Sequence, residues 1–122
     1  MASEKAKIKE QKLVDDIRAV NLQSDTYSVT VVPELGGKIT SILNRKTKRE
    51  FLTRTNIDYR KREYGDAFEN YERDGADECF PTVGGCPYPE YPWQGTDIPD
   101  HGELWCLPWD YEISKDKLRM WV

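Results

Sequence analysis

Two short strand-like runs joined by a tight corner constrain this chain more than any other feature. Residues 27–32 read YSVTVV and residues 38–43 read KITSIL, and both are rich in β-branched residues. The corner at 33–37 ends in Gly36-Gly37, a pair that suits positive φ or close backbone approach. Strands with so short a connection pair antiparallel, so the two runs predict a hairpin-like unit.

Further strand-like runs flank this unit. Residues 19–23 precede it, and residues 50–52 return after a polar turn at 44–48. Residues 109–122 resume the pattern around a turn at 114–116. We therefore predict an all-β fold, an antiparallel β-sandwich that opens with a β-meander.

The first residues differ from the rest. Residues 3–16 are rich in Lys, Glu, Ala and Gln, which favour helix, and a few apolar positions such as Ile8 and Leu13 form a weak stripe. We expect a tail or a short helix over residues 1–16. One incomplete β-sandwich domain is expected over residues 17–122.

The chain ends in the middle of a strand pattern. Leu118, Met120 and Val122 alternate with Arg119 and Trp121, and no turn or polar tail follows. An apolar strand at a chain end needs a neighbour. Either it pairs back onto the meander or its natural neighbour is absent, and we favour the second. Such an unpaired edge is also a place where a second copy of the chain can bind.

Composition narrows the class of protein. The 122 residues include four Trp and seven Tyr, which argues against disorder, and the net charge of −4 disfavours nucleic-acid binding. No apolar run approaches the roughly 20 residues that span a bilayer, and residues 1–12 lack a signal-peptide core. Three cysteines, an odd number, suggest free thiols in a reducing compartment. We expect a cytoplasmic protein without a membrane partner.

Residues 71–108 hold six of the seven prolines and five of the eight glycines, and they read as long, ordered, functional loops. His101 is the only histidine, between Asp100 and Gly102. An imidazole can donate or accept a proton at neutral pH, although a structural role is the alternative. Trp93, Trp105 and Trp109 can stack on a sugar ring or pack in a core.

Two acidic residues and a sulfur-containing set complete the candidates. Asp77 and Glu78 can accept hydrogen bonds from sugar hydroxyls, or lie on a loop surface. Three cysteines and His101 offer zinc ligands, but six residues separate Cys79 from Cys86, where zinc hooks have two to four. We expect no metal. Motifs for acyl transfer and metalloprotease chemistry are absent from the sequence.

Residues 27–44, followed by KTKREFL at 46–52, resemble the opening hairpins of the aldose 1-epimerase (galactose mutarotase-like) superfamily. Residues 74–82 (DGADECFPT), 99–105 (PDHGELW) and the later Pro108-Trp109 resemble the segment that carries the first active-site histidine in that family. The resemblance covers roughly residues 19–122.

The resemblance implies a large β-supersandwich, usually more than twice this length, with a sugar groove on one sheet. Members interconvert sugar anomers by acid–base proton transfer, without a metal or redox cofactor. His101 would be the catalytic residue that contacts the sugar. Only His101 is carried over from the family in this way, and we expect Asp77, Glu78, Glu103, Trp105 and Trp109 to bind the substrate beside it.

The chain also departs from the family pattern. It has no second histidine, and the glutamate base of relatives would lie beyond Val122, so we expect an N-terminal fragment that lacks the base. Glu103-Leu104 stand where many relatives have an aromatic residue and an Arg, which disfavours a phosphosugar. A non-catalytic carbohydrate-binding β module is the alternative function.

Overall fold

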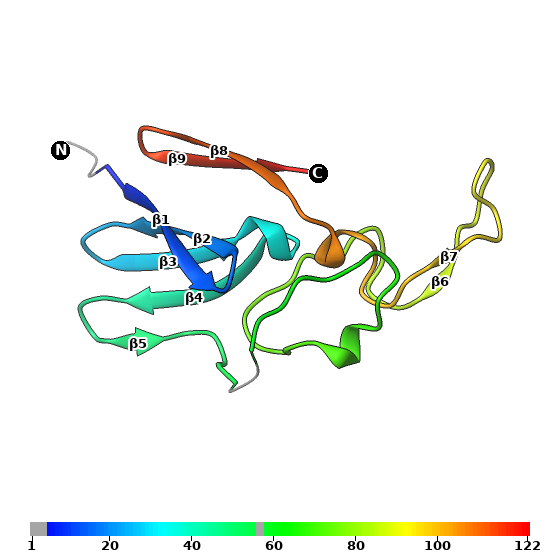
Figure 1. The fold of residues 1–122 in the computed structure, drawn as a ribbon, viewed down its shortest axis with the longest axis horizontal. Coiled ribbons are helices and arrows are strands. Elements are labelled where there is room, and N and C mark those ends of the chain that lie inside the picture. The colour runs from blue at the N-terminus through cyan, green and yellow to red at the C-terminus, as the bar shows by residue number, and fades with distance from the viewer. Residues whose placement is uncertain (1–4, 56–57) are drawn as a thin grey trace.

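A computed structural model describes residues 5–55 and 58–122 of the chain. The fold is all-β, mostly antiparallel and sandwich-like, as predicted, and the helices within the described ranges are single 3-10 turns (Figure 1). The strands are β1 (Lys7–Val14), β2 (Ile17–Gln23), β3 (Tyr27–Val32), β4 (Lys38–Asn44), β5 (Arg49–Glu50), β6 (Cys86–Pro87), β7 (Asp97–Ile98), β8 (Asp110–Ser114) and β9 (Lys117–Trp121). The 3-10 helices are η1 (Pro33–Leu35), η2 (Phe68–Asn70) and η3 (Leu104–Cys106).

Strands β1 to β5 form one antiparallel meander in chain order. The predicted strand at 27–32 is β3, and the glycine corner that follows it has the predicted geometry, with φ of +67° at both Gly36 and Gly37. A Cβ on Gly36 would lie 2.3 Å from the carbonyl oxygen of Trp105, so this corner requires glycine. The corner thereby brings the meander against η3.

The expected N-terminal helix is wrong. Residues 7–14 form β1, which pairs with β2 from Lys7 opposite Gln23 to Val14 opposite Ile17. The sheet therefore begins before residue 17, and the stretch read as a tail belongs to it. Helix propensity is a weak preference, and an isolated helix this short is marginal in water, whereas the β2 edge offers a full ladder of partners.

The apolar core is small and lies in two clusters. The first cluster joins β2, β3 and η1 and consists of Ile17, Ala19, Val32 and Leu35. Tyr71, Trp105 and Cys106 form a second cluster, with Phe68 and Leu107 against it. The second cluster lies among irregular segments, where no sheet supplies a regular packing face.

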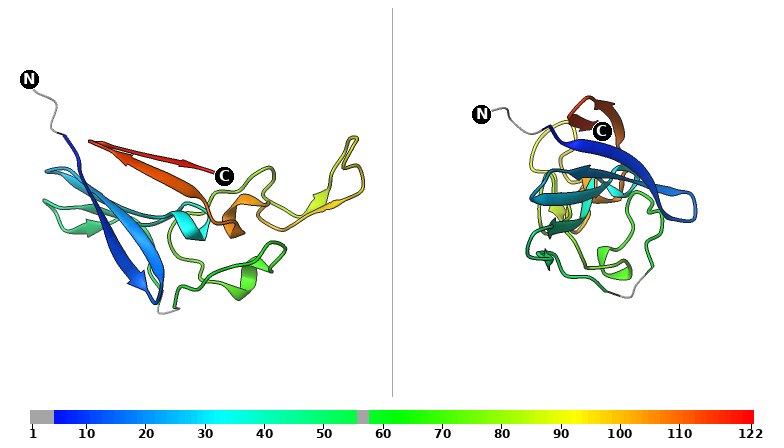
Figure 2. Two further views of the ribbon diagram at one scale, coloured as in Figure 1. Left: turned by 45° about the horizontal axis from the view of Figure 1, so that its top comes forward. Right: turned by 90° about the vertical axis from the view of Figure 1, so that its left-hand side faces the viewer.

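Strands β8 and β9 form a separate hairpin around the predicted turn. Figure 2 shows this hairpin over the β1 side of the meander, while the arm that carries β6 and β7 projects at the other end of the molecule. The Tyr111 hydroxyl on β8 donates a hydrogen bond of 2.6 Å to Glu10 on β1. Within residues 5–55 and 58–122, β9 is hydrogen-bonded only to β8, and Trp121 and Val122 are exposed.

No helix in the described ranges has the length and apolar character needed to cross a membrane.

Candidate functional site

His101 lies in a loop that fixes its ring closely. Its backbone has a φ of +65°, and its N–H donates a 2.6 Å hydrogen bond to the carbonyl of Val83. The imidazole stacks on the Phe68 ring, with centroids 3.6 Å apart and planes 8° from parallel, and about 30% of the side chain is exposed. The Nδ1 atom lies 2.8 Å from an Asp100 carboxylate oxygen. Because an ionised carboxylate only accepts, we assign the proton to Nδ1, which leaves Nε2 of the neutral ring as an acceptor.

Steric constraints require a glycine at position 102, directly after this histidine. Gly102 has a φ of +78°, and a Cβ there would lie 2.3 Å from the Phe80 carbonyl oxygen. The Glu103 N–H donates a 2.7 Å hydrogen bond to that same oxygen. Gly102 therefore allows the backbone of its loop to lie directly against the backbone at Phe80, and this contact orients Glu103.

Glu103 is held by two tyrosines from different segments. Tyr64 donates a hydrogen bond of 2.6 Å to its Oε1, and Tyr88 donates one of 2.9 Å to its Oε2. The hydrogen bond to the carboxylate raises the pKa of Tyr64 to about 12, and it raises the pKa of Tyr88 in the same way. Both phenols therefore stay neutral donors at physiological pH. Each carboxylate oxygen keeps a further lone pair for a ligand.

A groove of about 400 Å³ surrounds this carboxylate, lined by Tyr64, Tyr88, Trp93, Thr96 and Glu103. The Tyr64 and Trp93 side chains are open to solvent, at 56% and 62% relative exposure. Backbone hydrogen bonds within the β6–β7 arm hold its wall, from Tyr88 N–H to Thr96 O at 2.8 Å and from Thr96 N–H to Trp93 O at 2.9 Å. The groove thus combines exposed ring faces with one anchored carboxylate.

Trp105 and Trp109, which were expected to bind the substrate, lie outside the Glu103 groove. Trp105 is completely buried and meets Phe68 and Tyr71 edge to face, so its ring is part of a core and offers no face to a sugar. Trp109 is half-buried, its Nε1–H donates to the Leu104 carbonyl at 3.1 Å, and its ring covers Gly37. The burial of Trp105 corrects the expectation that its ring binds a sugar, and Trp109 does not line the Glu103 groove.

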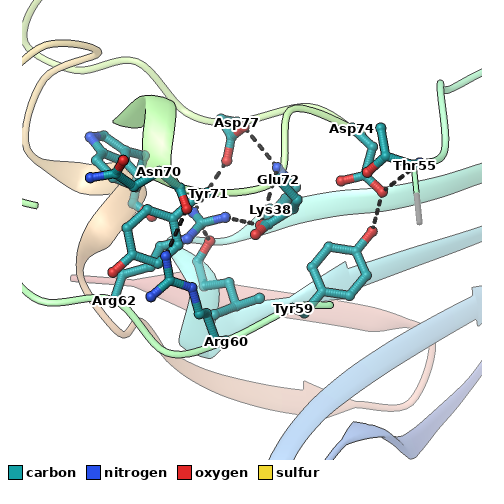
Figure 3. Close-up of polar contacts among 12 residues, drawn as sticks. Lys38, Thr55, Tyr59, Arg60, Arg62, Asn70, Tyr71, Glu72, Asp74 and Asp77 are labelled. Carbon is teal, nitrogen blue, oxygen red and sulfur yellow. Dashed lines mark hydrogen bonds and ion pairs between the residues drawn. The ribbon is translucent and has the colours of Figure 1, made fainter. Parts of the chain in front are cut away.

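The predicted Asp77 belongs to a buried ion-pair cluster (Figure 3). Lys38 lies 2.8 Å from Asp77 and 3.6 Å from Glu72, and Arg62 pairs with the same two carboxylates. The side chains of Lys38, Arg62 and Glu72 are almost wholly buried, so the cluster joins β4 to two loops out of contact with water. The neighbouring Glu78 is exposed. The side chains of Asp77 and Glu78 therefore lie in different environments, one in the ion-pair cluster and one in solvent. Neither lines the Glu103 groove.

Arg62 extends this cluster to the segment around the candidate site. Its Nη1 donates a 2.8 Å hydrogen bond to the carbonyl of Trp105 in η3. Its guanidinium lies 5.1 Å from the centre of the Trp105 ring and 5.4 Å from that of Tyr71. The cluster therefore positions η3, which directly follows Glu103.

A second groove of about 250 Å³ lies on the meander, lined by Gln11, Leu13, Thr30, Thr40, Ser41, Arg54, Thr55, Tyr59 and Asp74. Many of its polar groups are already engaged. Tyr59 donates to Asp74 at 2.7 Å, and Ser41 and Arg54 both donate to Glu50 (Figure 3 for Tyr59 and Asp74). Burial, together with the bond to Asp74, raises the pKa of Tyr59. This groove offers a ligand fewer free groups than the Glu103 groove.

The possible zinc set is not assembled. Cys79 and Cys86 are exposed, whereas Cys106 is buried and its thiol donates to the Glu103 carbonyl at 3.2 Å. Across residues 5–55 and 58–122, no three His, Cys, Asp or Glu side chains converge on one point where a metal ion would fit.

Sequence reasoning named Glu103 and Trp93 but missed the tyrosines beside them. Tyr64 lies in a charged stretch that reads as a plain surface loop, and Tyr88 lies among prolines. The distribution of charge along the sequence does distinguish this region from the rest of the chain. Residues 63–108 contain eleven acidic residues and one basic residue, Arg73, for a net charge of −10, whereas the whole chain carries −4.

Comparison with known proteins identifies the fold and nothing finer. No protein-family model matches the chain, and a search of curated proteins found no significant match. The fold is similar to that of HI1317, known from a crystal structure, with a TM-score of 0.53 and 21% sequence identity. The match covers 93% of this chain and 40% of HI1317, so the chain spans about two-fifths of that protein's length.

Proposed function

We propose that this chain is the sugar-binding, N-terminal part of an aldose 1-epimerase-like (mutarotase-like) protein. The observation that carries the proposal is the Glu103 groove, which combines exposed aromatic faces with an anchored carboxylate. The motif resemblance around His101 and the fold shared with a protein more than twice as long support it.

The groove suits a pyranose in two ways. The flat ring of Trp93 can cover the C–H face of a sugar at little conformational cost. Glu103 has lone pairs left after binding Tyr64 and Tyr88, and these accept hydrogen bonds from sugar hydroxyls. Apolar and polar recognition therefore meet in one site.

Anomer exchange requires one group that takes the anomeric hydroxyl proton and another that protonates the ring oxygen. His101, with Nε2 as acceptor, is the candidate for one of these groups. The chain contains no other histidine. We propose that the remaining group lies outside residues 1–122, and that these residues alone bind sugar without interconverting its anomers.

A non-catalytic carbohydrate-binding module is the second candidate. One observation favours it: His101 is stacked on Phe68, bonded to Asp100 and absent from the lining of the Glu103 groove. A proton-transfer role would require the sugar to reach the Nε2 atom from that groove.

Titration calorimetry with glucose and galactose tests the binding proposal. We expect Trp93→Ala to weaken binding about fivefold, because a stacking ring contributes about 1 kcal/mol. Tyr91→Ala is the matched control, since Tyr91 lies on the same arm, is 91% exposed and does not line the groove. Absence of sugar binding, or equal losses in both variants, would overturn the proposal.

Polarimetry tests whether residues 1–122 catalyse anomer exchange by themselves. We expect the 122-residue chain to bind α-glucose without accelerating its mutarotation. Acceleration that is lost in His101→Ala would show that the described residues already hold a complete catalytic pair.

We also propose a cytoplasmic location, from the three free cysteines, and a contact between two copies along the β9 edge. Sedimentation over a range of concentrations tests the second proposal. A single monomer boundary throughout would refute it.

A further inference from the structure

We infer that the Glu103 groove selects sugars that carry a protonated amine over neutral and phosphorylated sugars. The inference rests on the proposed sugar-binding function and names the substrate class of the same groove.

The charge of the groove favours a cationic ligand. None of the residues that line the groove is basic, and Glu103 is its one ionisable carboxylate. Two of the eleven acids in residues 63–108, Glu72 and Asp77, are balanced by Lys38 and Arg62. Most of the remaining acids have no such buried partner, so residues 63–108, which supply every residue that lines the groove, keep an excess negative charge. A phosphate would be repelled there, and an ammonium group attracted.

The aromatic rings of the groove also favour a cationic ligand. Tyr64, Tyr88 and Trp93 line the groove together with the carboxylate. Aromatic faces attract cations through their quadrupole, and sites lined by several aromatic rings are a recurring way to bind ammonium ligands. A neutral hydroxyl at the same position would lack this attraction.

The hydrogen-bonding capacity of Glu103 suits an ammonium group. Each Glu103 oxygen accepts one phenol, at 2.6 Å from Tyr64 and 2.9 Å from Tyr88, and a carboxylate has about four acceptor positions. An ammonium group brings three donors and full charge, so its bond to a remaining position is charge-assisted. The two phenols also fix the carboxylate, so a ligand does not have to order it on binding.

The test compares four sugars on the unaltered chain by calorimetry, at low salt and at a pH where the amine is protonated. We expect glucosamine to bind at least tenfold more tightly than glucose. N-acetylglucosamine, which has the same position substituted but no charge, should bind like glucose, and glucose 6-phosphate should bind more weakly. Raising the salt concentration should reduce the advantage of glucosamine.

Two variants locate the effect. Glu103→Gln should remove most of the preference for glucosamine, with folding checked by circular dichroism. Glu90→Gln is the control, because Glu90 is an exposed acid on the same arm outside the groove, and it should keep the preference.

The outcomes distinguish the two proposals. Equal affinity for glucosamine and N-acetylglucosamine, with Trp93-dependent binding intact, would overturn the amine preference and leave sugar binding standing. Absence of binding by all four sugars would overturn sugar binding itself. If Glu103→Gln kept the preference for glucosamine, a group other than Glu103 would recognise the ammonium charge, and the inference about this groove would be wrong.

Discussion

The meander and the loop region of residues 58–108 reach order by different means. In the meander, five strands share continuous ladders of backbone hydrogen bonds. In the loop region, strands are limited to two-residue pairs, and order comes from the Lys38–Arg62–Glu72–Asp77 ion-pair cluster and the rings around Trp105. A segment without hydrophobic periodicity can thus be fixed when charges and rings replace the missing ladders.

One contact between the two regions lies at a single carbonyl group. The Trp105 oxygen accepts a hydrogen bond from Arg62 on the loop side and lies against Gly36 on the meander side. Substitutions on either side of this oxygen therefore perturb one region at a time.

The largest effect is expected from Glu72→Gln. It leaves two buried cations with one carboxylate, and an uncompensated buried charge costs about 3–5 kcal/mol of the free energy of unfolding. Urea denaturation measures this loss. Hydrogen exchange should show lower protection at the Glu103 amide than at β3, since the cluster supports the loops.

Glu69→Gln is the matched control for that substitution. Glu69 is an exposed acid on η2, three residues away, and its loss should change stability by less than about 0.5 kcal/mol. If both variants were equally stable, the ion-pair cluster would not be what orders the loop region.

An intermediate effect is expected where the two regions touch. Gly36→Ala would place a Cβ 2.3 Å from the Trp105 oxygen at a φ of +67°, and we expect a loss of about 2–4 kcal/mol. Gly65→Ala shares the positive φ, at +85°, but a Cβ there has no neighbour within 4 Å, so about 1 kcal/mol of backbone strain should remain. Thermal denaturation of both variants separates the steric clash with the Trp105 oxygen from the backbone strain of a positive φ. Equal losses would mean that the approach of η3 to the corner is not tight.

The smallest effect concerns pH and the meander. Burial raises the pKa of Glu50, but hydrogen bonds from Ser41 and from the amides of Ile42 and Leu52 outweigh it and lower the pKa from 4.5 to about 2. A lowered folded-state pKa stabilises the protein above pH 4.5, and this stability is lost as the pH falls toward 2. We expect Glu50→Gln to cost about 1–2 kcal/mol at pH 7, and the difference from the unaltered chain to vanish near pH 2. A pH-independent difference would rule out this explanation.

The sequence predicted the meander better than the loops for a physical reason. Residues 27–32 match β3 because alternation along a strand is a local pattern. The helix expected at residues 3–16 failed because pairing with β2 overrides a weak propensity.

The candidate site was harder to predict because its contacts are distant in sequence. Tyr64 and Glu103 are 39 positions apart, and such a pair leaves no local periodicity. Glu103 was identified through its place after His-Gly. The burial of Trp105 was not foreseen, because a ring among prolines and glycines is compatible with either a core or a groove.

The uneven distribution of charge has a consequence for the whole molecule. Residues 63–108 carry −10 while the rest of the chain carries +6, and the meander and the β6–β7 arm lie at opposite ends of the long axis (Figure 1). Such a separation creates a large electric dipole. At neutral pH and low ionic strength, we expect ion-exchange resins of either sign to retain the protein, each through a different end.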